Sequence, residues 1–290
     1  MRRTFIAVVI AAALALVGCK PLLVPPGDAP LRYRDEVFAS VTKTADITYG
    51  TAVRRDTNAE VSLLADVYAP SGDTAVARPL IIWVHGGSFK GGSKTSGEIV
   101  DQANVFAKKG YVSMSINYRL SPQGCAASGP TTECVLAIID AKHDAQAAVR
   151  YAKANAAALG IDPNRIAING SSAGAITALN VGYDATEVGT GGSNPGQSSD
   201  VEAAVSLSGA RLMGTLDADD APSLLFHGTA DVVVPYAWAE ATTTDAKAAG
   251  LESYLTAWDG ATHVPYAAHR TEIIDQTTNF LYWTLALDQL

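Results

Sequence analysis

Ser172 lies in the segment Gly170-Ser171-Ser172-Ala173-Gly174, which has the spacing G-x-S-x-G. An apolar run at residues 166–169 precedes the segment, and a stretch rich in alanine, isoleucine and leucine follows it. The motif therefore falls at a turn between a predicted strand and a predicted helix, where a side chain in place of either glycine would crowd the neighbouring elements. Such a turn would lift Ser172 Oγ out of the sheet at the positive end of the helix dipole. We expect Ser172 to be a nucleophile, with Ser171 as the alternative serine.

A second glycine-containing segment, His85-Gly86-Gly87-Ser88, ends an apolar run at residues 79–84. A serine that attacks a carbonyl needs backbone N–H groups to stabilise the oxyanion that develops, and glycines let the backbone approach the substrate closely. We assign this role to the amides of Gly86, Gly87 and Ala173. His85 itself is expected to be structural. The alternative for the whole segment is a simple glycine turn after a strand.

The base and the acid of such a site must follow the nucleophile in the chain. His263 lies in a loop after the last predicted strand, from which an imidazole can reach the serine. Asp231, four residues after His227, would hold that imidazole in its productive tautomer. His269 and His227 remain alternative bases, although His227 is better interpreted as a packing residue. Asp231 could instead be an ordinary turn residue, in which case the reserve acids are Asp217, Asp219 and Asp220.

The elements that position these residues follow from the apolar pattern of the chain. Strands are predicted at residues 46–53, 61–68, 79–84, 111–117, 165–169, 201–207, 223–226 and 251–258. Helices are predicted at residues 98–109, 135–158, 173–183, 236–248 and 269–287. Runs that are apolar on both faces are typical of parallel strands covered by helices. The alternation of strands and helices predicts an α/β fold with a mostly parallel sheet and no large lid domain. An open site would be bordered by the loops 125–134 and 189–199.

These motifs occur in the order found in the α/β-hydrolase carboxylesterases. Beyond the two glycine segments, the resemblance rests on the three stretches Asn117-Tyr-Arg-Leu-Ser-Pro122, Asp162-Pro-Asn-Arg165 and His227-Gly-Thr-Ala-Asp231. It covers the chain from about Val61 to its C-terminus. More narrowly, the chain resembles the hormone-sensitive-lipase-like and feruloyl-esterase-like bacterial branch. Val264-Pro265 after His263 departs from the small residue that often follows the family's histidine, which makes the base the least certain member of the predicted triad.

The resemblance implies a three-layer α/β-hydrolase fold and an acyl-serine mechanism on carboxylic esters that needs no metal and no cofactor. Small esters or esters linked to a polysaccharide are the expected substrates. A serine peptidase or amidase is the alternative enzyme. A catalytically inactive binding module on the same fold is the alternative from another class, although such modules usually lack a triad residue and none is missing here.

The composition agrees with one globular domain. The chain has 290 residues, 48% of them hydrophobic and 17% charged, which is enough apolar material for a large core. Its formal net charge of −8 argues against nucleic acid as a partner, because nucleic-acid binding depends on cationic contacts to phosphate.

The N-terminus has the pattern of a secretion signal. Arg2 and Arg3 precede an apolar stretch at residues 5–17, which is short for a bilayer span. The stretch ends in Leu16-Val17-Gly18-Cys19, which resembles the lipobox of bacterial lipoproteins, whose cysteine is acylated. The alternative is ordinary signal cleavage nearby. We therefore expect a signal peptide at 1–19, a tether at 20–44 and the hydrolase domain at 45–290. We also expect export through the Sec pathway and a place in the cell envelope, where the lipid at Cys19 is the only contact with the membrane.

Two further cysteines remain, Cys125 and Cys134, and they bracket a short loop with Gly129-Pro130 at its turn. In an oxidising compartment such a pair is expected to form a disulfide. Closing so short a loop would stabilise the fold by at most ~3 kcal/mol in the chain-entropy model. The alternative is a pair of free buried thiols.

Overall fold

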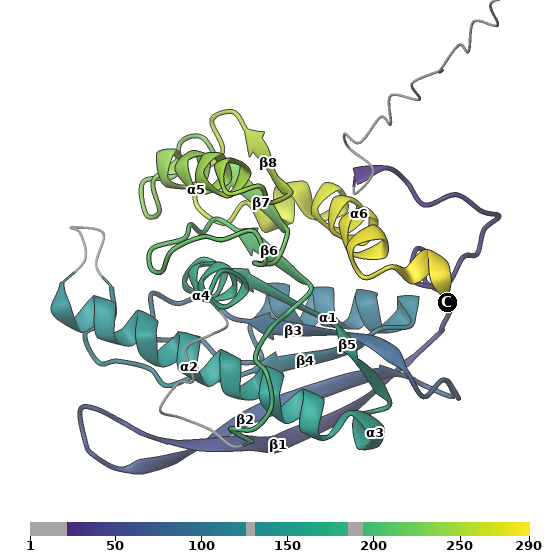
Figure 1. Ribbon diagram of the computed structural model, residues 1–290, viewed down its shortest axis with the longest axis horizontal. Coiled ribbons are helices and arrows are strands. Elements are labelled where there is room, and N and C mark those ends of the chain that lie inside the picture. The colour runs from purple at the N-terminus through teal and green to yellow at the C-terminus, as the bar shows by residue number, and fades with distance from the viewer. Residues whose placement is uncertain (1–21, 126–130, 185–193) are drawn as a thin grey trace, which may run out of the picture.

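The computed structural model describes residues 22–125, 131–184 and 194–290 (Figure 1). The predicted leader with Cys19 lies outside the described residues. Within these ranges, eight strands form one sheet in the order β1-β2-β4-β3-β5-β6-β7-β8. The strands are β1 (Val41–Val53), β2 (Glu60–Pro70), β3 (Arg78–Val84), β4 (Val112–Ile116), β5 (Ile161–Ser171), β6 (Ala203–Leu207), β7 (Ser223–Gly228) and β8 (Ser253–Trp258). The helices are α1 (Gly97–Lys109), α2 (Thr132–Ala154), α3 (Ala156–Leu159), α4 (Ala173–Gly182), α5 (Tyr236–Ala248) and α6 (Tyr266–Thr284), followed by the 3₁₀ turn η2 (Leu287–Gln289).

The sheet is parallel from β4 to β8, and only β1 and β2 run antiparallel to their neighbours. Because all six parallel strands point the same way, the loops that leave their carboxyl ends meet at one edge. No described segment forms a separate lid domain. The predicted α/β fold with a mostly parallel sheet and no large lid is therefore confirmed.

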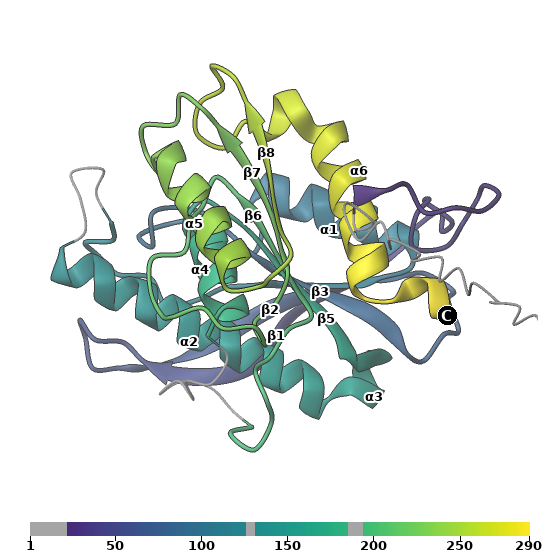
Figure 2. The same cartoon turned by 45° about the horizontal axis from the view of Figure 1, so that its top comes forward.

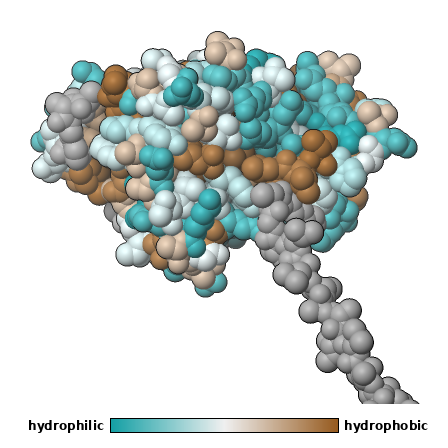
Figure 3. All heavy atoms as spheres, turned by 90° about the horizontal axis from the view of Figure 1, so that it is seen from above, coloured by the Kyte–Doolittle hydropathy of each residue, from teal (hydrophilic) through white to brown (hydrophobic). Residues whose placement is uncertain are grey.

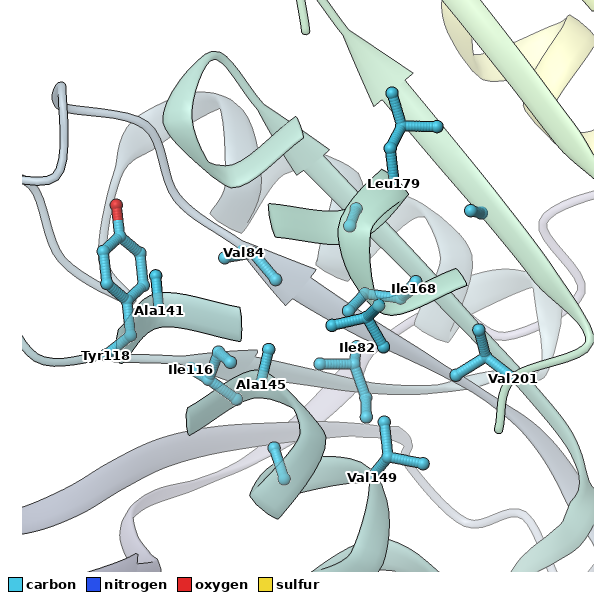
Figure 4. Packing of buried hydrophobic residues seen from close by; sticks show 14 of the residues in the cluster. Ile82, Val84, Ile116, Tyr118, Ala141, Ala145, Val149, Ile168, Leu179 and Val201 are labelled. Atoms are coloured by element: carbon cyan, nitrogen blue, oxygen red, sulfur yellow. The ribbon is translucent and has the colours of Figure 1, made fainter. Parts of the chain in front are cut away.

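Helices cover both faces of the sheet, which makes three layers (Figures 1 and 2). β3 shows why both faces must be covered. Ile82 and Val84 pack with α2 and α4, whereas Ile81 and Trp83 pack with α1 and α6. On the first face, Ala141 and its neighbours one and two turns along α2 point toward β3, β4 and β5 (Figure 4). Alternate side chains of a strand point to opposite faces, so a continuously apolar strand fills two cores at once.

The outer surface is largely polar, and apolar side chains gather in a few patches on the face seen in Figure 3. Among the described helices, none has both the length and the apolar character that crossing a bilayer requires.

The segment expected to be a tether differs from that expectation in its described part. Tyr33 is buried and packs edge-on against Tyr111 at 5.4 Å, and its amide donates to Lys109 O at 2.8 Å. Near the C-terminal end of α6, Trp283 Nε1 donates to Leu23 O at 2.8 Å. β1 begins at Val41, before the expected boundary at residue 45. Aromatic burial and backbone hydrogen bonds thus hold residues 22–40 against the domain.

A buried ion pair fixes the segment that leaves β4. Arg119 Nε donates to both carboxylate oxygens of Asp144 at 3.0 Å, and the Arg119 amide donates to the same group at 2.7 Å. Tyr118, the preceding residue, stacks on His85 at 4.4 Å and donates to His85 O at 3.0 Å. The ion pair on α2 therefore supports, through Tyr118, the strand end that leads into the Gly86–Gly87 segment.

Replacing Asp144 by alanine is expected to lower the free energy of unfolding by about 3–5 kcal/mol, because Arg119 would lose its main partner inside the protein. The matched control is Asp245→Ala, which removes a surface partner of Arg211 and should cost less than ~1 kcal/mol. Urea denaturation of the three proteins measures both values. Equal losses for the two variants would contradict the structural role given to the buried pair.

Candidate active site

Ser172 occupies a strained turn between β5 and α4. Its backbone has φ 54° and ψ −118°, values that a residue with a side chain rarely adopts. The flanking glycines allow the turn. A Cβ on Gly170 would lie 2.1 Å from Gly174 O, and a Cβ on Gly174 would lie 2.0 Å from Val84 O. The spacing G-x-S-x-G is therefore a packing requirement of β5, α4 and β3, and it places Ser172 at the carboxyl edge of the sheet.

The structure brings together the three side chains predicted to form a triad. Ser172 Oγ lies 2.7 Å from His263 Nε2, and His263 Nδ1 lies 2.7 Å from Asp231 Oδ2. Asp231 follows β7 and His263 follows β8, so both loops leave the same edge of the sheet as the Ser172 turn. An ionised carboxylate can only accept hydrogen bonds, so it fixes the proton of His263 on Nδ1. Nε2 then has a free lone pair that can accept the Ser172 proton.

Asp231 is held in its ionised form from several directions. Its side chain is fully buried, and Oδ1 accepts the amides of Val233 at 2.8 Å and Val234 at 3.0 Å. Burial alone would raise the pKa of Asp231, but hydrogen bonds from His227, His263 and the Val233 amide outweigh that effect. The pKa therefore lies well below its ordinary value. The site thus contains a carboxylate, not a carboxylic acid, at neutral pH.

His227 does more than the packing role expected from the sequence. Its Nε2 donates to Val234 O at 2.9 Å and lies 3.1 Å from Asp231 Oδ2. Its Nδ1 has no hydrogen-bond partner among the described residues. Because both groups near Nε2 are acceptors, the proton of the neutral ring belongs on Nε2. His227 is a second donor to the acid, a contact that its position at a strand end did not indicate.

The loop that carries His263 is fastened on both sides. A Cβ on Gly228 would lie 2.2 Å from Ala261 O, and the Ala230 amide donates to that same oxygen at 3.0 Å. On the other side, the Val264 amide donates to Ser208 Oγ at 3.0 Å. Ser208 was missed by sequence reasoning. Its only signal is its position directly after an apolar strand, at the edge where the site is formed.

The Gly86–Gly87 segment lies against the Ser172 turn. A Cβ on Gly86 would lie 3.1 Å from Ser172 Cβ. The amides of Gly86, Gly87 and Ala173 donate no hydrogen bond to any described residue. Backbone N–H groups are rarely left without an acceptor, so these amides are available to an oxyanion beside Ser172.

His85 lies beneath this segment. Nδ1 donates to Gly86 O at 2.7 Å, and the ring is buried against Tyr118. Burial lowers the pKa of His85 to about 4, against the opposing effect of the hydrogen bond to Gly86 O, so the imidazole is neutral at pH 7. These contacts agree with the structural role expected from the sequence.

The alternative residues do not join the site. His269 stacks on Trp258 at 4.0 Å and lies 3.7 Å from Glu272. The reserve acids bond within their own loop, where the Asp217 amide donates to Asp220 Oδ2 at 2.9 Å. Ser171 is buried in β5, and its Oγ has no hydrogen-bond partner among the described residues. Within the described ranges, no group of three or more histidine, cysteine, aspartate or glutamate residues is arranged to hold a metal ion.

A cavity of about 560 Å³ opens beside Ser172. Its walls come from the segments after β3, β4, β6 and β7 and from the N-terminal parts of α2, α4 and α5. The predicted disulfide between Cys125 and Cys134 is present, and both cysteines line the cavity.

Of the predicted border at residues 189–199, residues 189–193 lie outside the described residues, and none of residues 194–199 lines the cavity. The chain enters β6 at the opposite edge of the sheet, where the Glu202 carboxylate accepts the amide of Ile166, in the middle of β5, at 2.7 Å. The reason is geometric: α4 begins at the Ser172 turn and runs away from it.

The mostly parallel sheet and the hydrogen-bonded line of Ser172, His263 and Asp231 are those of the α/β-hydrolase fold. Residues 65–218, more than half of the chain, match the family model described as BD-FAE, and the chain belongs to that family.

Known proteins with related sequences include a hydrolase and a lipase. Phenmedipham hydrolase of Pseudarthrobacter oxydans is 37% identical over 118 residues, which make up 40% of this chain and 22% of that protein. Bile salt-activated lipase of Homo sapiens is 31% identical over 140 residues, or 46% of this chain and 17% of that protein. The match spans only about a fifth of the length of these relatives. Among solved structures, Thermogutta terrifontis esterase 2 phosphorylated by paraoxon is 25% identical with a TM-score of 0.67, covering 87% of this chain and 97% of that chain.

Replacing Asp231 by asparagine is expected to lower the free energy of unfolding at pH 7 by about 1.5–3 kcal/mol, the usual value of hydrogen bonds to a charged group. A lowered pKa stabilises the folded state above the unfolded-state value of 3.8, and this contribution is lost as the pH falls below it. The stability difference between wild type and variant should therefore narrow as the pH is lowered from 5 to 2.5.

Urea denaturation across this pH range measures the difference. Asp245→Asn, at a side chain that is 53% exposed, is the control and should follow the wild-type curve. Parallel curves for wild type and Asp231→Asn would contradict the depressed pKa of the buried carboxylate.

Proposed function

We propose that this protein is a serine hydrolase of carboxylic esters that works through an acyl-serine intermediate. The observation that carries the proposal is the line of hydrogen bonds from Ser172 Oγ through His263 to Asp231, at a turn that leaves the hydroxyl at the edge of a cavity. Membership of the BD-FAE family and the names of the relatives, a hydrolase, a lipase and an esterase, support the same chemistry.

In the first half of the reaction, Ser172 Oγ attacks the ester carbonyl carbon while His263 Nε2 takes the hydroxyl proton. The carbonyl oxygen becomes an oxyanion that accepts hydrogen bonds from the amides of Gly86, Gly87 and Ala173, each worth roughly 3–4 kcal/mol in the transition state. The bond to the alcohol oxygen then breaks, and His263 gives its proton to that oxygen. The alcohol leaves and the acyl group stays on Ser172.

In the second half, a water molecule takes the place of the alcohol. His263 removes its proton as the water oxygen attacks the acyl-serine, and the same amides stabilise the second oxyanion. The bond between the acyl carbon and Ser172 Oγ then breaks as His263 returns the proton to Ser172 Oγ, and the carboxylic acid leaves. Ionised Asp231 stabilises the imidazolium that forms in both halves, and the low pKa of Asp231 keeps it charged throughout.

We further propose that the protein acts in the cell envelope, attached through a lipid on Cys19 after export by the Sec pathway. The proposal is supported by the leader, in which Arg2 and Arg3 precede an apolar stretch that ends in Leu16-Val17-Gly18-Cys19. The disulfide between Cys125 and Cys134 suits an oxidising compartment of this kind. Within this proposal, residues 1–19 are a signal peptide, the following residues lead from the anchor, and the hydrolase domain extends to the C-terminus.

Ser172→Ala is expected to reduce kcat for p-nitrophenyl acetate by at least ~10³-fold, because the variant has no nucleophile. Ser171→Ala is the matched control. It removes the neighbouring hydroxyl, which makes no hydrogen bond among the described residues, and should keep most of the activity. A matched pair of ester and amide substrates, assayed in parallel, separates an esterase from an amidase. Full activity of Ser172→Ala, or loss of activity only in Ser171→Ala, would overturn the assignment.

Cys19→Ala is expected to move the protein from the membrane fraction to the soluble fraction of a bacterial host, because the lipid would have no attachment point. Incorporation of labelled palmitate into the wild-type chain and its absence from the variant measure the acylation directly. Lys20→Ala, at the adjacent position, should keep the wild-type distribution. A wild-type chain that remains unlabelled and soluble would contradict the lipid anchor.

A further inference from the structure

The cavity beside Ser172 contains almost no polar group. Of the side chains that line it, those of Ser172 and Ser88 carry a hydroxyl and that of Trp238 carries an indole N–H, and none carries a charge. The remainder are the disulfide and apolar side chains such as Phe89, Ile176 and Met213. Its volume of about 560 Å³ lies within the ~300–1,000 Å³ range of small-molecule sites. Such a wall offers few partners to sugar hydroxyls and no opposite charge to a charged group, so it favours an apolar group of the substrate.

The opening of the cavity is apolar as well. The described residues include ten large hydrophobic side chains that are exposed, and half of them line this cavity. They are Val135, Leu212, Val232, Val233 and Trp238. Exposed apolar side chains that gather in one patch usually mark a binding surface, whereas scattered ones need no special explanation.

The position of His263 decides which half of the ester enters the cavity. Ser172 and Ala173 belong to the cavity wall, whereas His263, the group that must protonate the departing alcohol, does not. The alcohol oxygen has to lie beside His263 Nε2 when the bond breaks. The acyl group is attached to the opposite side of the carbonyl carbon, which points it into the cavity.

The disulfide joins two walls of this cavity. Cys125 follows β4, and its amide donates to Ser88 O at 2.8 Å, beside the Gly86–Gly87 segment. Cys134 lies in the first turn of α2, where its amide donates to Thr131 Oγ1 at 3.2 Å. The covalent link therefore holds the start of α2 against the segment that leads from β3.

We propose that the natural substrates are esters of medium-length aliphatic acids, that the acyl chain occupies this cavity, and that the Cys125–Cys134 disulfide is the wall that selects for it. The inference rests on the proposed esterase function, and it identifies the half of the substrate that this chain recognises. It also makes the disulfide a specificity determinant in addition to its effect on stability.

The first test compares p-nitrophenyl octanoate with p-nitrophenyl acetate on the oxidised wild-type protein. Burying the longer chain should raise kcat/KM by ~10-fold or more, since each buried methylene group contributes a factor of about 4 at full burial. Ser172→Ala treated identically provides the blank. A ratio of 1 or less would overturn the assignment of the cavity to the acyl chain.

The second test changes the wall. The double variant Cys125→Ala/Cys134→Ala is expected to lower the octanoate-to-acetate ratio of kcat/KM at least fivefold. Reduction of the wild-type disulfide should lower the ratio likewise, and reoxidation should restore it. Val135→Trp puts a larger side chain into the cavity wall, keeps both cysteines and should also lower the ratio. Val76→Trp, at an exposed position that does not line the cavity, should leave the turnover of both substrates unchanged.

The outcomes separate the two proposals. A high wild-type ratio that persists in the double variant and after reduction would overturn the role of the disulfide. A high ratio that persists in Val135→Trp would overturn the location of the acyl chain. Absence of turnover of every ester by the folded wild type would overturn the esterase function and, with it, this inference. Turnover with the opposite chain preference would overturn the inference alone.

Discussion

The contact between the Ser172 turn and the end of β3 is the constraint on which the rest of the site depends. Gly174 lies so close to Val84 O that no side chain fits between them, and Gly170 is in similar contact with Gly174. Only this close packing lets α4 begin directly after β5, and it forces Ser172 into a backbone conformation that costs roughly 1–3 kcal/mol. The burial of β5 in both cores, and of α4 in the core that also contains α2, offsets that cost. The strained backbone thereby holds the Ser172 hydroxyl in place before any substrate binds.

The parallel sheet supplies the remaining groups because its strands end at one edge. β6, β7 and β8 contribute Ser208, Asp231 and His263 in turn, and hydrogen bonds join their loops. Through these hydrogen bonds, each group restricts the conformation of the loop that carries the next one. The Val264 amide is held by Ser208 Oγ, and the imidazole before it is held by a buried carboxylate that itself has two further donors on Oδ1. Catalytic groups that are fixed in this way need little reorganisation during the reaction.

The sequence indicated those features that a contiguous stretch encodes. The G-x-S-x-G segment between an apolar strand and a helix located Ser172, and continuous apolar runs predicted a parallel sheet covered on both faces. Asp231 and His263 could be chosen from their place after strands, because loops at the carboxyl ends of parallel strands meet. The structure places His263 beside Ser172 and Asp231 beside His263.

Other features depend on contacts between distant residues and have no local signal. The hydrogen bond from His227 to the acid, the hold of Ser208 on the Val264 amide and the docking of Tyr33 on α1 all belong to this kind. Residues 194–199 were expected to border the site but do not line the cavity, because a composition rich in glycine and serine indicates a loop but not where it lies. Its position follows from the direction of α4, which a pattern of residue types does not specify.

The most direct test of the central claim is the site at which an organophosphate labels the folded protein. Paraoxon phosphorylates a serine hydroxyl only when a neighbouring base activates it. Peptide mapping by mass spectrometry after brief exposure should find one diethylphosphoryl group, on the peptide that contains Ser172, with none on the urea-unfolded chain. Labelling at another serine, or an unmodified Ser172 in the folded protein, would contradict an activated nucleophile at this turn.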